Sequence, residues 1–600
     1  MKKILSIMTA ALLGTAVSAQ ETYDNAQLAT KDLNGTARYV GMGGAMEALG
    51  ADLSTIGTNP AGIGMFRRSM VAGSFGFNSQ QDAKSFGNAN KTNMSFDQAG
   101  FVYSMRSGRH SMLNFGFNYT KSKNFDQILT AAGRLNNASQ NKLSAMKNAN
   151  GVYTLQDKNN GLVSNSGAYS QADYLYSNVL FNHYDANNPN DPNNATLTDK
   201  GVIVNQTTGL PVYYNATGYD FGRSTTGYIG QYDFNVSGNS NDRFYWGFTV
   251  GIYDVHYNSS SLYSESLVDG DKAIGDVAMN DERKITGTGF DVKAGLIFRP
   301  AEESPFRIGL YVHTPTWYDL TTRNYTVLNN NTNEAYGSSE RGKSSESYDF
   351  KFYTPWRFGV SLGHTVGNYL ALGATYEYAD YTTNDIRVND GGEVDYWGNY
   401  YETSSRDEAM KQNIKNSLKG VHTVKLGMEF KPEKNFAVRL GYNYQSAMYN
   451  KNGFKDGSLE SYGTYYASTT DYTNWKDTHR FTAGVGYNYG KFSFDLAYQY
   501  SQTNGDFYPF MSYVDNSEPK FDNVCDAVKV SNKRNQLLFT VGYKFQTHLT
   551  VQKFGVIKKK PYLCTAFRKC EQADMAQLVE QRIRNAWVPG SSPGIGSTLS

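Results

Sequence analysis

Few residues in this chain of 600 have the types and spacing that catalysis or metal binding requires. The eight histidines are scattered and form no spaced metal or haem pair. The three cysteines are too few for a disulfide framework and lack the spacing of metal ligands. No serine and histidine can be assigned as a catalytic pair. The sequence therefore predicts no enzyme, no catalytic residue, no cofactor and no metal.

The stretch from Gly41 to Gly44 is the one candidate for nucleotide binding. A dinucleotide fingerprint needs G-x-G-x-x-G between a strand and a helix, but Met46 stands where the third glycine belongs. No Walker sequence occurs. The net charge of +2 gives no basic footprint for a nucleic acid. We therefore expect neither nucleotides nor nucleic acids as partners.

The elements that surround this stretch are predicted to be strands. The chain is rich in aromatic residues, with 46 Tyr and 33 Phe, yet it is polar on average, with a mean hydropathy of −0.55. After the first twenty residues no apolar run approaches the ~18 residues of a spanning helix. Instead, apolar residues alternate with polar ones or glycine, as Phe244, Trp246 and Phe248 do. This pattern is typical of an outer-membrane β-barrel.

Fourteen segments show this alternation, and an even number suits a closed antiparallel barrel. The gaps between them are alternately short and long, which places the short turns in the periplasm and the long loops outside the cell. A soluble β-sandwich or solenoid is the alternative, and the regular alternation of gap lengths disfavours it. The predicted strands are 69–78, 95–106, 110–122, 221–238, 243–258, 284–298, 305–325, 344–363, 369–385, 421–431, 435–446, 479–489, 491–503 and 534–545.

Three motifs near the N-terminus carry a family resemblance. They are TARYVGMGGA at 36–45, DLS at 52–54 and NPAG at 59–62. In this order and spacing they resemble the N-terminal hatch of the FadL/TodX family of outer-membrane transporters for hydrophobic compounds. The segments 354–361 and 376–381 are similar to barrel strands of family members from Bacteroidetes. The resemblance extends over residues 20–545 and implies a 14-stranded antiparallel transmembrane β-barrel with a small hatch in its lumen.

The resemblance also implies which residues belong to the hatch and its gating. They are Arg38, Gly41, Gly43, Gly44, Asn59, Pro60, Ala61 and Gly62. Glycines allow positive φ and close backbone approach inside a lumen. Asn59-Pro60 disfavours helix, 60–62 predicts a tight turn, and 46–53 predicts a short helix. A static plug and a plug that moves to release ligand both remain open.

The function implied is passive transport of hydrophobic compounds, such as long-chain fatty acids or aromatics, by a monomer in the bacterial outer membrane. Extracellular loops, chiefly 123–220, would capture the ligand, and hatch movement would release it. The ligand-binding residues stay unknown. Outer-membrane lipid and the barrel assembly machinery are expected partners, the latter through the terminal aromatic strand that ends at Phe545. The alternative is a structural or adhesive barrel whose loops bind surface ligands.

The predicted boundaries follow from these assignments. Residues 1–19 form a signal peptide, because a charged start, a short apolar core and a small-residue cleavage site follow one another. Residues 20–68 form the hatch and 69–545 the barrel with its long extracellular loops. The basic, aperiodic segment 546–600 is predicted to be a non-native or disordered tail, since 575–594 resembles the translation of a transfer-RNA gene. A short periplasmic extension is the alternative.

Overall fold

The structure is a computed structural model, and it describes residues 21–87, 89–157, 162–180, 194–336, 341–515 and 518–545. The predicted signal peptide (1–19) and the predicted tail (546–600) lie outside the described residues. No described helix is both long and apolar enough to cross a membrane.

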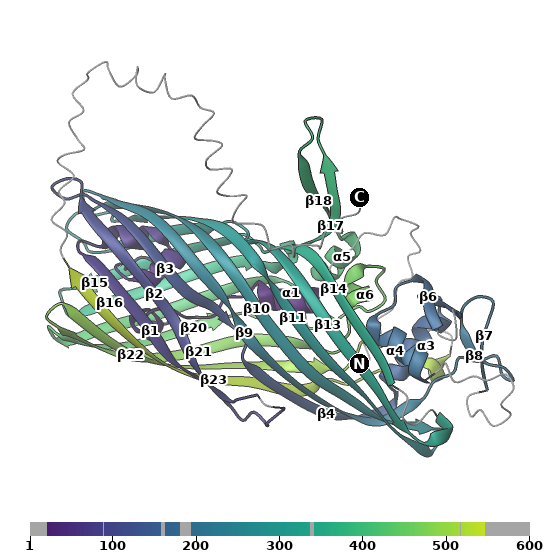
Figure 1. The fold of residues 1–600 in the computed structure, drawn as a ribbon. Helices are drawn as coiled ribbons and strands as arrows, with labels where there is room; N and C mark the ends of the chain where they lie inside the picture. Colours follow the sequence, from purple (N-terminus) through teal and green to yellow (C-terminus); the bar gives the residue numbers. More distant parts are fainter. Residues whose placement is uncertain are drawn as a thin grey trace, which may run out of the picture. The chain divides into compact units, whose positions relative to one another are not determined.

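One large antiparallel sheet dominates the described part of the chain (Figure 1). Its strands are β1 (Ser69–Gln81), β2 (Thr92–Arg106), β3 (Met112–Asn124), β4 (Gln127–Ala138), β9 (Asn215–Ser240), β10 (Phe244–Asp269), β11 (Lys272–Phe298), β12 (Arg307–His313), β13 (Trp317–Thr332), β14 (Arg341–Tyr353), β15 (Arg357–Val366), β16 (Leu370–Asp380), β17 (Asp385–Val394), β18 (Tyr400–Arg406), β19 (Gly420–Glu433), β20 (Phe436–Gln445), β21 (Tyr472–Tyr489), β22 (Phe492–Tyr508) and β23 (Val528–Phe545).

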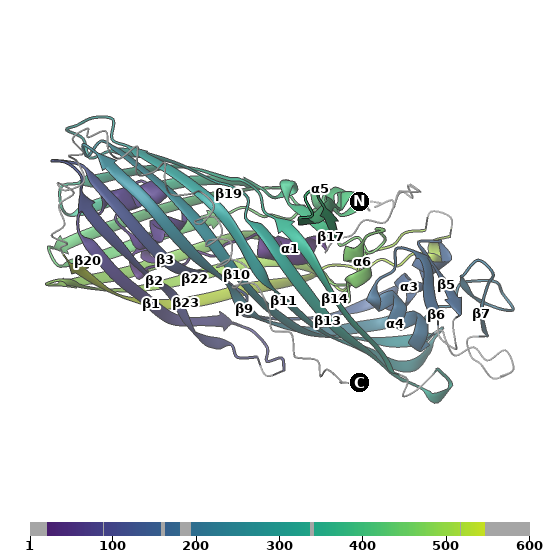
Figure 2. The same cartoon turned by 45° about the horizontal axis from the view of Figure 1, so that its top comes forward.

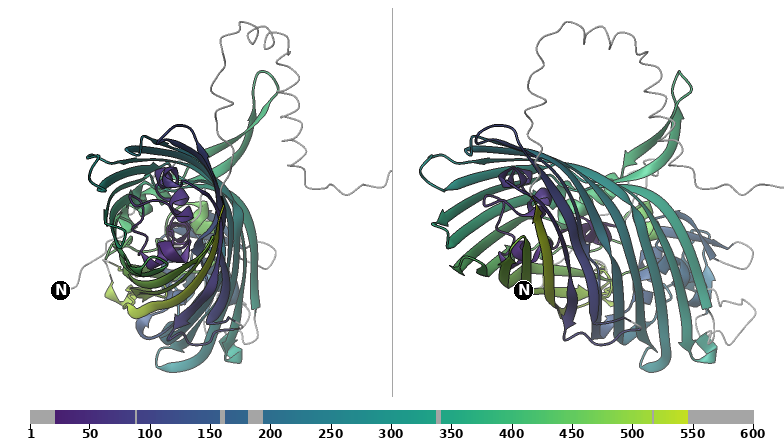
Figure 3. Two further views of the ribbon diagram at one scale, coloured as in Figure 1. Left: turned by 90° about the vertical axis from the view of Figure 1, so that its left-hand side faces the viewer. Right: turned by 60° about the vertical axis from the view of Figure 1, so that its left-hand side comes forward.

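The sheet closes on itself because β1 pairs with β23, from Ser69 opposite Phe545 to Gln81 opposite Lys533. Its 19 strands form 14 wall strands among the described residues. β4, β13, β14 and β17 continue β3, β12, β15 and β16 across short breaks, and β18 belongs to a hairpin outside the wall. The predicted 14-stranded antiparallel barrel is confirmed, and each predicted strand overlaps one wall strand. Figure 3 shows the wall curving around the lumen.

Three neighbouring wall strands are broken, although the sequence predicts 305–325, 344–363 and 369–385 as continuous strands. The breaks between β12 and β13 and between β14 and β15 contain Pro315 and Pro355. Proline has no N–H for the strand ladder, so pairing stops and resumes beyond it. The third break holds a short 3₁₀ turn, Tyr381–Thr383, which the Asp380 side chain caps.

The two faces of the wall are reversed relative to those of a soluble protein. Large apolar side chains on the outside are about half exposed, and they include Phe248, Phe290, Leu310, Phe358, Leu440 and Phe481. Buried polar and charged side chains point inward, and they include Asp233, Lys293, Glu377, Lys425, Glu429 and Arg439. An apolar exterior and a polar interior are what a transmembrane barrel requires.

The segments that the sequence predicts to be extracellular loops contain more regular structure than expected. Residues 259–283 are not a loop, because β10 and β11 stay paired as far as Asp269 opposite Lys272. The predicted loop 123–220 contains β4, α3 (Gln140–Ala149), β5 (Tyr153–Asp157), β6 (Leu162–Gly167), α4 (Gln171–Leu180), β7 (Ala195–Leu197) and β8 (Ile203–Asn205). Figure 2 shows these elements gathered at one end of the barrel. They share an apolar core that includes Leu143, Leu175 and Tyr176.

Candidate functional site

The N-terminal segment runs through the barrel lumen (Figure 3, left). It contains α1 (Thr22–Leu28), α2 (Ala37–Gly41) and two 3₁₀ helices, η1 (Leu53–Gly57) and η2 (Pro60–Met65). α2 contacts β20 to β23, whereas η2 contacts β9 to β11 on another side of the wall. We call residues 21–66 the hatch, because they bridge the lumen before the chain enters β1.

Glycines of the wall let the hatch backbone approach the strands closely. A Cβ atom at Gly441, Gly427 or Gly373 would collide with hatch backbone. We call the wall glycines that face the hatch backbone the glycine collar, and they are Gly247, Gly363, Gly373, Gly427, Gly441 and Gly484. From the other side, Gly43 has a φ of +62° and its Cβ would lie 2.9 Å from the nitrogen of Tyr442. The hatch backbone therefore packs directly against the backbone of the wall strands, with no side chain between them.

Two carboxylates join the hatch to the wall through ion pairs. Glu429 of β19 accepts from Nε of Arg38 at 2.9 Å and from Nε of Arg439 at 2.7 Å. Glu47 of the hatch, fully buried, accepts from the Lys425 ammonium at 2.7 Å. The two carboxylates are buried, whereas the Arg38 side chain is 28% exposed, and Lys431 lies 3.2 Å from Glu429 as a third cation. Removing either carboxylate therefore leaves cations without their anionic partner.

The structure places the eight predicted hatch residues in three groups. Arg38 and Gly41 belong to α2, with Gly43 and Gly44 in the turn that follows, where both have positive φ. Asn59 caps η2 through a bond from the nitrogen of Ala61 at 3.2 Å. Gly41 keeps helical backbone, so the expected positive φ applies to only two of the three glycines.

Two local predictions for the hatch are wrong. The tight turn expected at 60–62 is the start of η2, because proline suits the first turn of a helix and Asn59 supplies the cap. The short helix expected at 46–53 is absent, since the chain turns at Gly50, which has a φ of +62°. Regular structure begins only at η1, where Asp52 supplies the cap.

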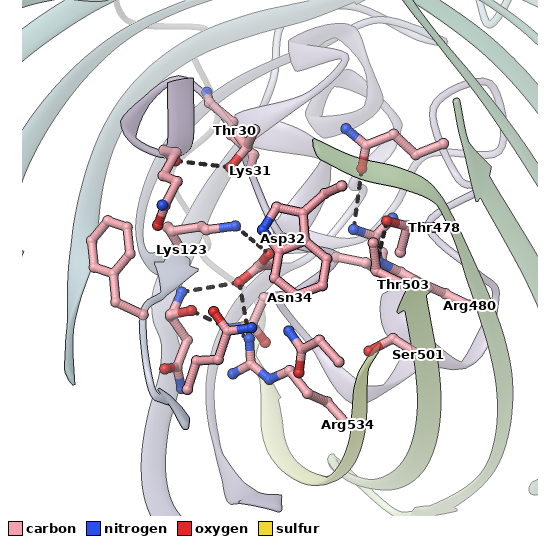
Figure 4. A pocket seen from close by; sticks show the side chains of 18 of the residues that line it. Thr30, Lys31, Asp32, Asn34, Lys123, Thr478, Arg480, Ser501, Thr503 and Arg534 are labelled. Atoms are coloured by element: carbon pink, nitrogen blue, oxygen red, sulfur yellow. Dashed lines mark hydrogen bonds and ion pairs between the residues drawn. The ribbon is translucent and has the colours of Figure 1, made fainter. Parts of the chain in front are cut away.

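A cavity of about 190 Å³ lies beside the hatch, between residues 27–34 and the wall (Figure 4). Its apolar part comes from Phe125, Met448, Tyr449 and Trp475. Its charged part comes from Lys31, Lys121, Lys123, Lys476, Arg480 and Arg534 against the carboxylates Asp32 and Asp97. The cavity is thus amphipathic, with more positive than negative groups.

A second cavity of about 100 Å³ lies deeper along the hatch. It is lined by η1 residues such as Gly57 and by buried wall residues such as His313 and Glu377. Residues 31–34, Gln445 and Arg480 border both cavities. The segment 31–34 therefore lies where one cavity meets the other. Sequence reasoning did not identify this segment, which carries no glycine or proline signal.

Helix α1 lies beside the larger cavity, which its residue Gln27 lines. The Tyr23 ring stacks on Tyr449 at 5.1 Å and its hydroxyl donates to Asn474 at 2.8 Å. Asp24 forms an ion pair with Arg283, and Glu21 forms one with Lys455. These contacts attach α1 to the wall and to the segments at one end of the barrel.

The contact between α1 and helix α5 (Glu408–Ser417) is expected to depend on pH. The hydroxyl of Thr22 donates to the sulfur of Met410 at 3.1 Å, and Asp407 caps α5. Burial raises the pKa of the Asp407 carboxyl to about 7. Because this folded-state pKa lies above the usual value, the stabilisation is full below about pH 4 and is lost as pH rises through about 7.

We therefore predict that amide exchange in α5, corrected for its intrinsic pH dependence, is faster at pH 8 than at pH 6. Asp407→Asn keeps a side-chain cap and removes the titrating group, so this variant should show little difference between the two pH values. Equal protection of α5 at both pH values in the unsubstituted protein would contradict the prediction.

Comparisons with solved structures return membrane transporters. The toluene transporter TbuX of Ralstonia pickettii shares 13% identity and a TM-score of 0.42, over 86% of this chain and 99% of its own. A Pseudomonas aeruginosa FadL homologue has 12% sequence identity and a TM-score of 0.43, and the match covers 89% of this chain and 100% of the homologue. The toluene transporter TodX of P. putida has 10% sequence identity and a TM-score of 0.43, and the match covers 86% of this chain and 100% of TodX. The chain is similar to FadL- and TodX-type transporters.

The solved structures belong to the FadL/TodX transporters that the hatch motifs resemble, which agrees with the resemblance predicted from the sequence. Identities and TM-scores of this size carry no argument about ligand or activity. No protein-family model matches the chain, and no curated protein matches it.

Proposed function

We propose that this protein is a passive transporter of the bacterial outer membrane for hydrophobic or amphipathic small molecules, such as long-chain fatty acids. The observation that carries the proposal is the pair of cavities that meet at residues 31–34 inside a closed barrel. A ligand would enter past α1, occupy the larger cavity and proceed when the hatch moves. Arg38, Gly41, Gly43, Gly44, Asn59, Pro60, Ala61 and Gly62 would govern that movement.

The apolar part of the larger cavity can hold a hydrocarbon chain without any covalent step. Phe125, Met448, Tyr449 and Trp475 line it. Each buried CH₂ group contributes about 0.8 kcal/mol, so four or five such groups provide roughly 3–4 kcal/mol. That is enough for reversible capture in the millimolar range and permits release.

Uptake of labelled dodecanoate tests the proposal. A strain that lacks this gene should take up the label several-fold more slowly than the parent, and the gene supplied on a plasmid should restore the rate. The ratio of the parent's uptake rate to that of the deletion strain should be largest at low external concentration, where the binding cavity is not saturated. Undiminished uptake of dodecanoate and of several other hydrophobic compounds in the deletion strain would overturn the proposal.

A structural or adhesive barrel is the second candidate, and the β17–β18 hairpin favours it. Tyr396 and Trp397 at its tip are 94% and 82% exposed. The Asp395 carboxylate holds the turn by accepting from the backbone of Trp397 and Asn399 and from the Tyr401 hydroxyl. Exposed aromatic residues on an ordered turn are typical of a binding surface.

Replacing 391–399 by a Gly-Ser turn separates the two candidates. For a transporter, dodecanoate uptake by this variant should stay within about twofold of the parent. An adhesive barrel would instead lose binding to neighbouring cells with the hairpin, and uptake would be insensitive to the gene and to substitutions at Asn59 or Gly43.

A further inference from the structure

A carboxylate of the hatch already occupies the most cationic part of the larger cavity. Oδ1 of Asp32 lies 3.1 Å from the Lys123 ammonium, and Oδ2 accepts from the backbone nitrogen of Asn124 at 3.0 Å. The Arg534 guanidinium lies 4.0 Å from Oδ2 (Figure 4). Burial raises the pKa of Asp32, but Lys123 and Arg534 outweigh it and hold the pKa at about 2. The wall strands thus form an anion site, which the hatch fills.

Positive charge remains beyond what Asp32 neutralises. The Arg480 side chain is 9% exposed and forms no ion pair within 4 Å in the described part of the chain. Its guanidinium donates to the amide oxygens of Asn443 at 3.0 Å and Gln445 at 3.2 Å. A buried guanidinium with amide partners alone is poorly compensated. A second negative group in this cavity would be stabilised.

Asp32 also belongs to the segment that borders both cavities. Its backbone nitrogen donates to the carbonyl of Ser122 at 2.8 Å, and the neighbouring Asn34 amide donates to Asp97 at 2.9 Å. These polar contacts attach Asp32 and Asn34 to β2 and β3. Lys31 donates to the Tyr253 hydroxyl of β10 at 2.8 Å, and Asn34 accepts from Gln536 of β23 at 3.2 Å. The glycine collar contacts lie in later parts of the hatch. Movement of this short segment can join the cavities while α2 and η2 stay in place.

We propose that Asp32 is a built-in occupant of an anion site and that the anionic head group of an amphipathic ligand displaces it from Lys123 and Arg534. This inference rests on the proposed transport function and adds a ligand class and a coupling step. The ligand's apolar tail lies against Phe125, Met448, Tyr449 and Trp475, and its head group pairs with Lys123, Arg534 and Arg480. Displacement of Asp32 releases residues 31–34.

Exchange of one anion for another explains why the class of ligand matters. A carboxylate that replaces Asp32 keeps Lys123 and Arg534 paired, so no buried cation is left alone. A neutral hydrocarbon or alcohol of the same length cannot make this exchange. A ligand shifts the hatch only by as much as it prefers the displaced state. Organic anions with an apolar tail therefore open the segment, and neutral compounds do not.

Equilibrium binding to the purified full-length protein in amphipol tests this inference, with dodecanoate and 1-dodecanol as probes of equal chain length. Arg480→Gln should weaken dodecanoate binding about tenfold, the size of one charge-assisted hydrogen bond, because Arg480 pairs with the head group but forms no ion pair with Asp32 that would offset the loss. Asp32→Asn removes the competing anion and should strengthen dodecanoate binding about tenfold. Both variants should change dodecanol binding less than twofold. Lys272→Gln, at an exposed extracellular turn, is the matched control for a lost positive charge.

Single-channel conductance in planar bilayers supplies the second measurement. Dodecanoate should raise the open probability of the parent protein, and Asp32→Asn should raise it without ligand. Arg480→Gln leaves the partners of Asp32 in place and provides an independent test should Asp32→Asn fail to fold. It should lower the response to dodecanoate.

Equal binding of dodecanoate to the parent protein and Arg480→Gln would overturn the inference, as would an increase in open probability with dodecanol. These outcomes leave the proposed transport function intact. That function fails separately, when deletion of the gene does not slow uptake of either kind of probe.

Discussion

Substituting valine for Gly441 is expected to expel the hatch from its seat while the barrel itself still closes. Gly441 faces the lumen from β20, and a Cβ there would collide with the backbone of Gly43. The two nearest hatch atoms, the nitrogen of Gly43 and the carbonyl carbon of Met42, belong to the backbone, so no flexible hatch side chain can move aside. Overpacking of this kind costs about 1–3 kcal/mol. The hatch relieves this strain when its backbone at Met42 and Gly43 moves away from β20.

Protease sensitivity of the hatch and bilayer conductance measure this effect. The variant should run as a folded barrel on an unheated gel, yet lose hatch residues to added protease and conduct ions continuously. Gly73→Ala is the control, because the nearest atom to a Cβ at Gly73 is a carbonyl oxygen 3.8 Å away. A protected hatch and a closed channel in Gly441→Val would show that the collar tolerates side chains.

The architecture of the barrel is predictable from sequence because it depends on local patterns. Alternation sets which face of each strand is apolar, and Gly-, Asn- and Pro-rich gaps mark the turns. The strand breaks at Pro315 and Pro355 were visible as prolines inside predicted strands, but alternation continues on both sides and conceals the interruption. Extensions such as those of β10 and β11 beyond the apolar band were missed because their exteriors are polar, which resembles loop composition.

The hatch motifs identify Arg38 from sequence, but not its partner. Glu429 lies 391 positions away, and an alternating pattern indicates a face without indicating which residues meet across a lumen. The glycine collar did leave a signal in the sequence, namely inward-facing glycines such as Gly373, Gly427 and Gly441 in successive wall strands. The role of Asp32 cannot be predicted from the sequence, because it is one aspartate in a polar stretch and its partners, Lys123 and Arg534, lie in distant strands.

Replacing Glu429 by glutamine is expected to have the second large effect. Glu429 accepts from both Arg38 and Arg439, and its side chain is 2% exposed. Without the charge on Glu429, Arg439 keeps its ion pair with Asp495 at 2.7 Å, whereas Arg38 keeps only neutral acceptors, the carbonyl of Ala51 at 3.0 Å and the amide oxygen of the new glutamine. Because the Arg38 side chain is 28% exposed, the loss costs about 1–3 kcal/mol, less than for a fully buried pair, and it weakens the attachment of α2.

The channel should therefore open intermittently in Glu429→Gln, seen as brief conductance events and as sensitivity of cells to an antibiotic that the outer membrane excludes. Glu402→Gln is the matched control, because Glu402 pairs with Lys351 at 3.5 Å on the surface, where such pairs contribute little. Arg38→Lys discriminates further. It keeps the charge but loses the two-pronged contact with Glu429, so it should open less often than Glu429→Gln and more often than the parent. Equal behaviour of both variants and the parent would show that backbone packing on the glycine collar alone retains the hatch.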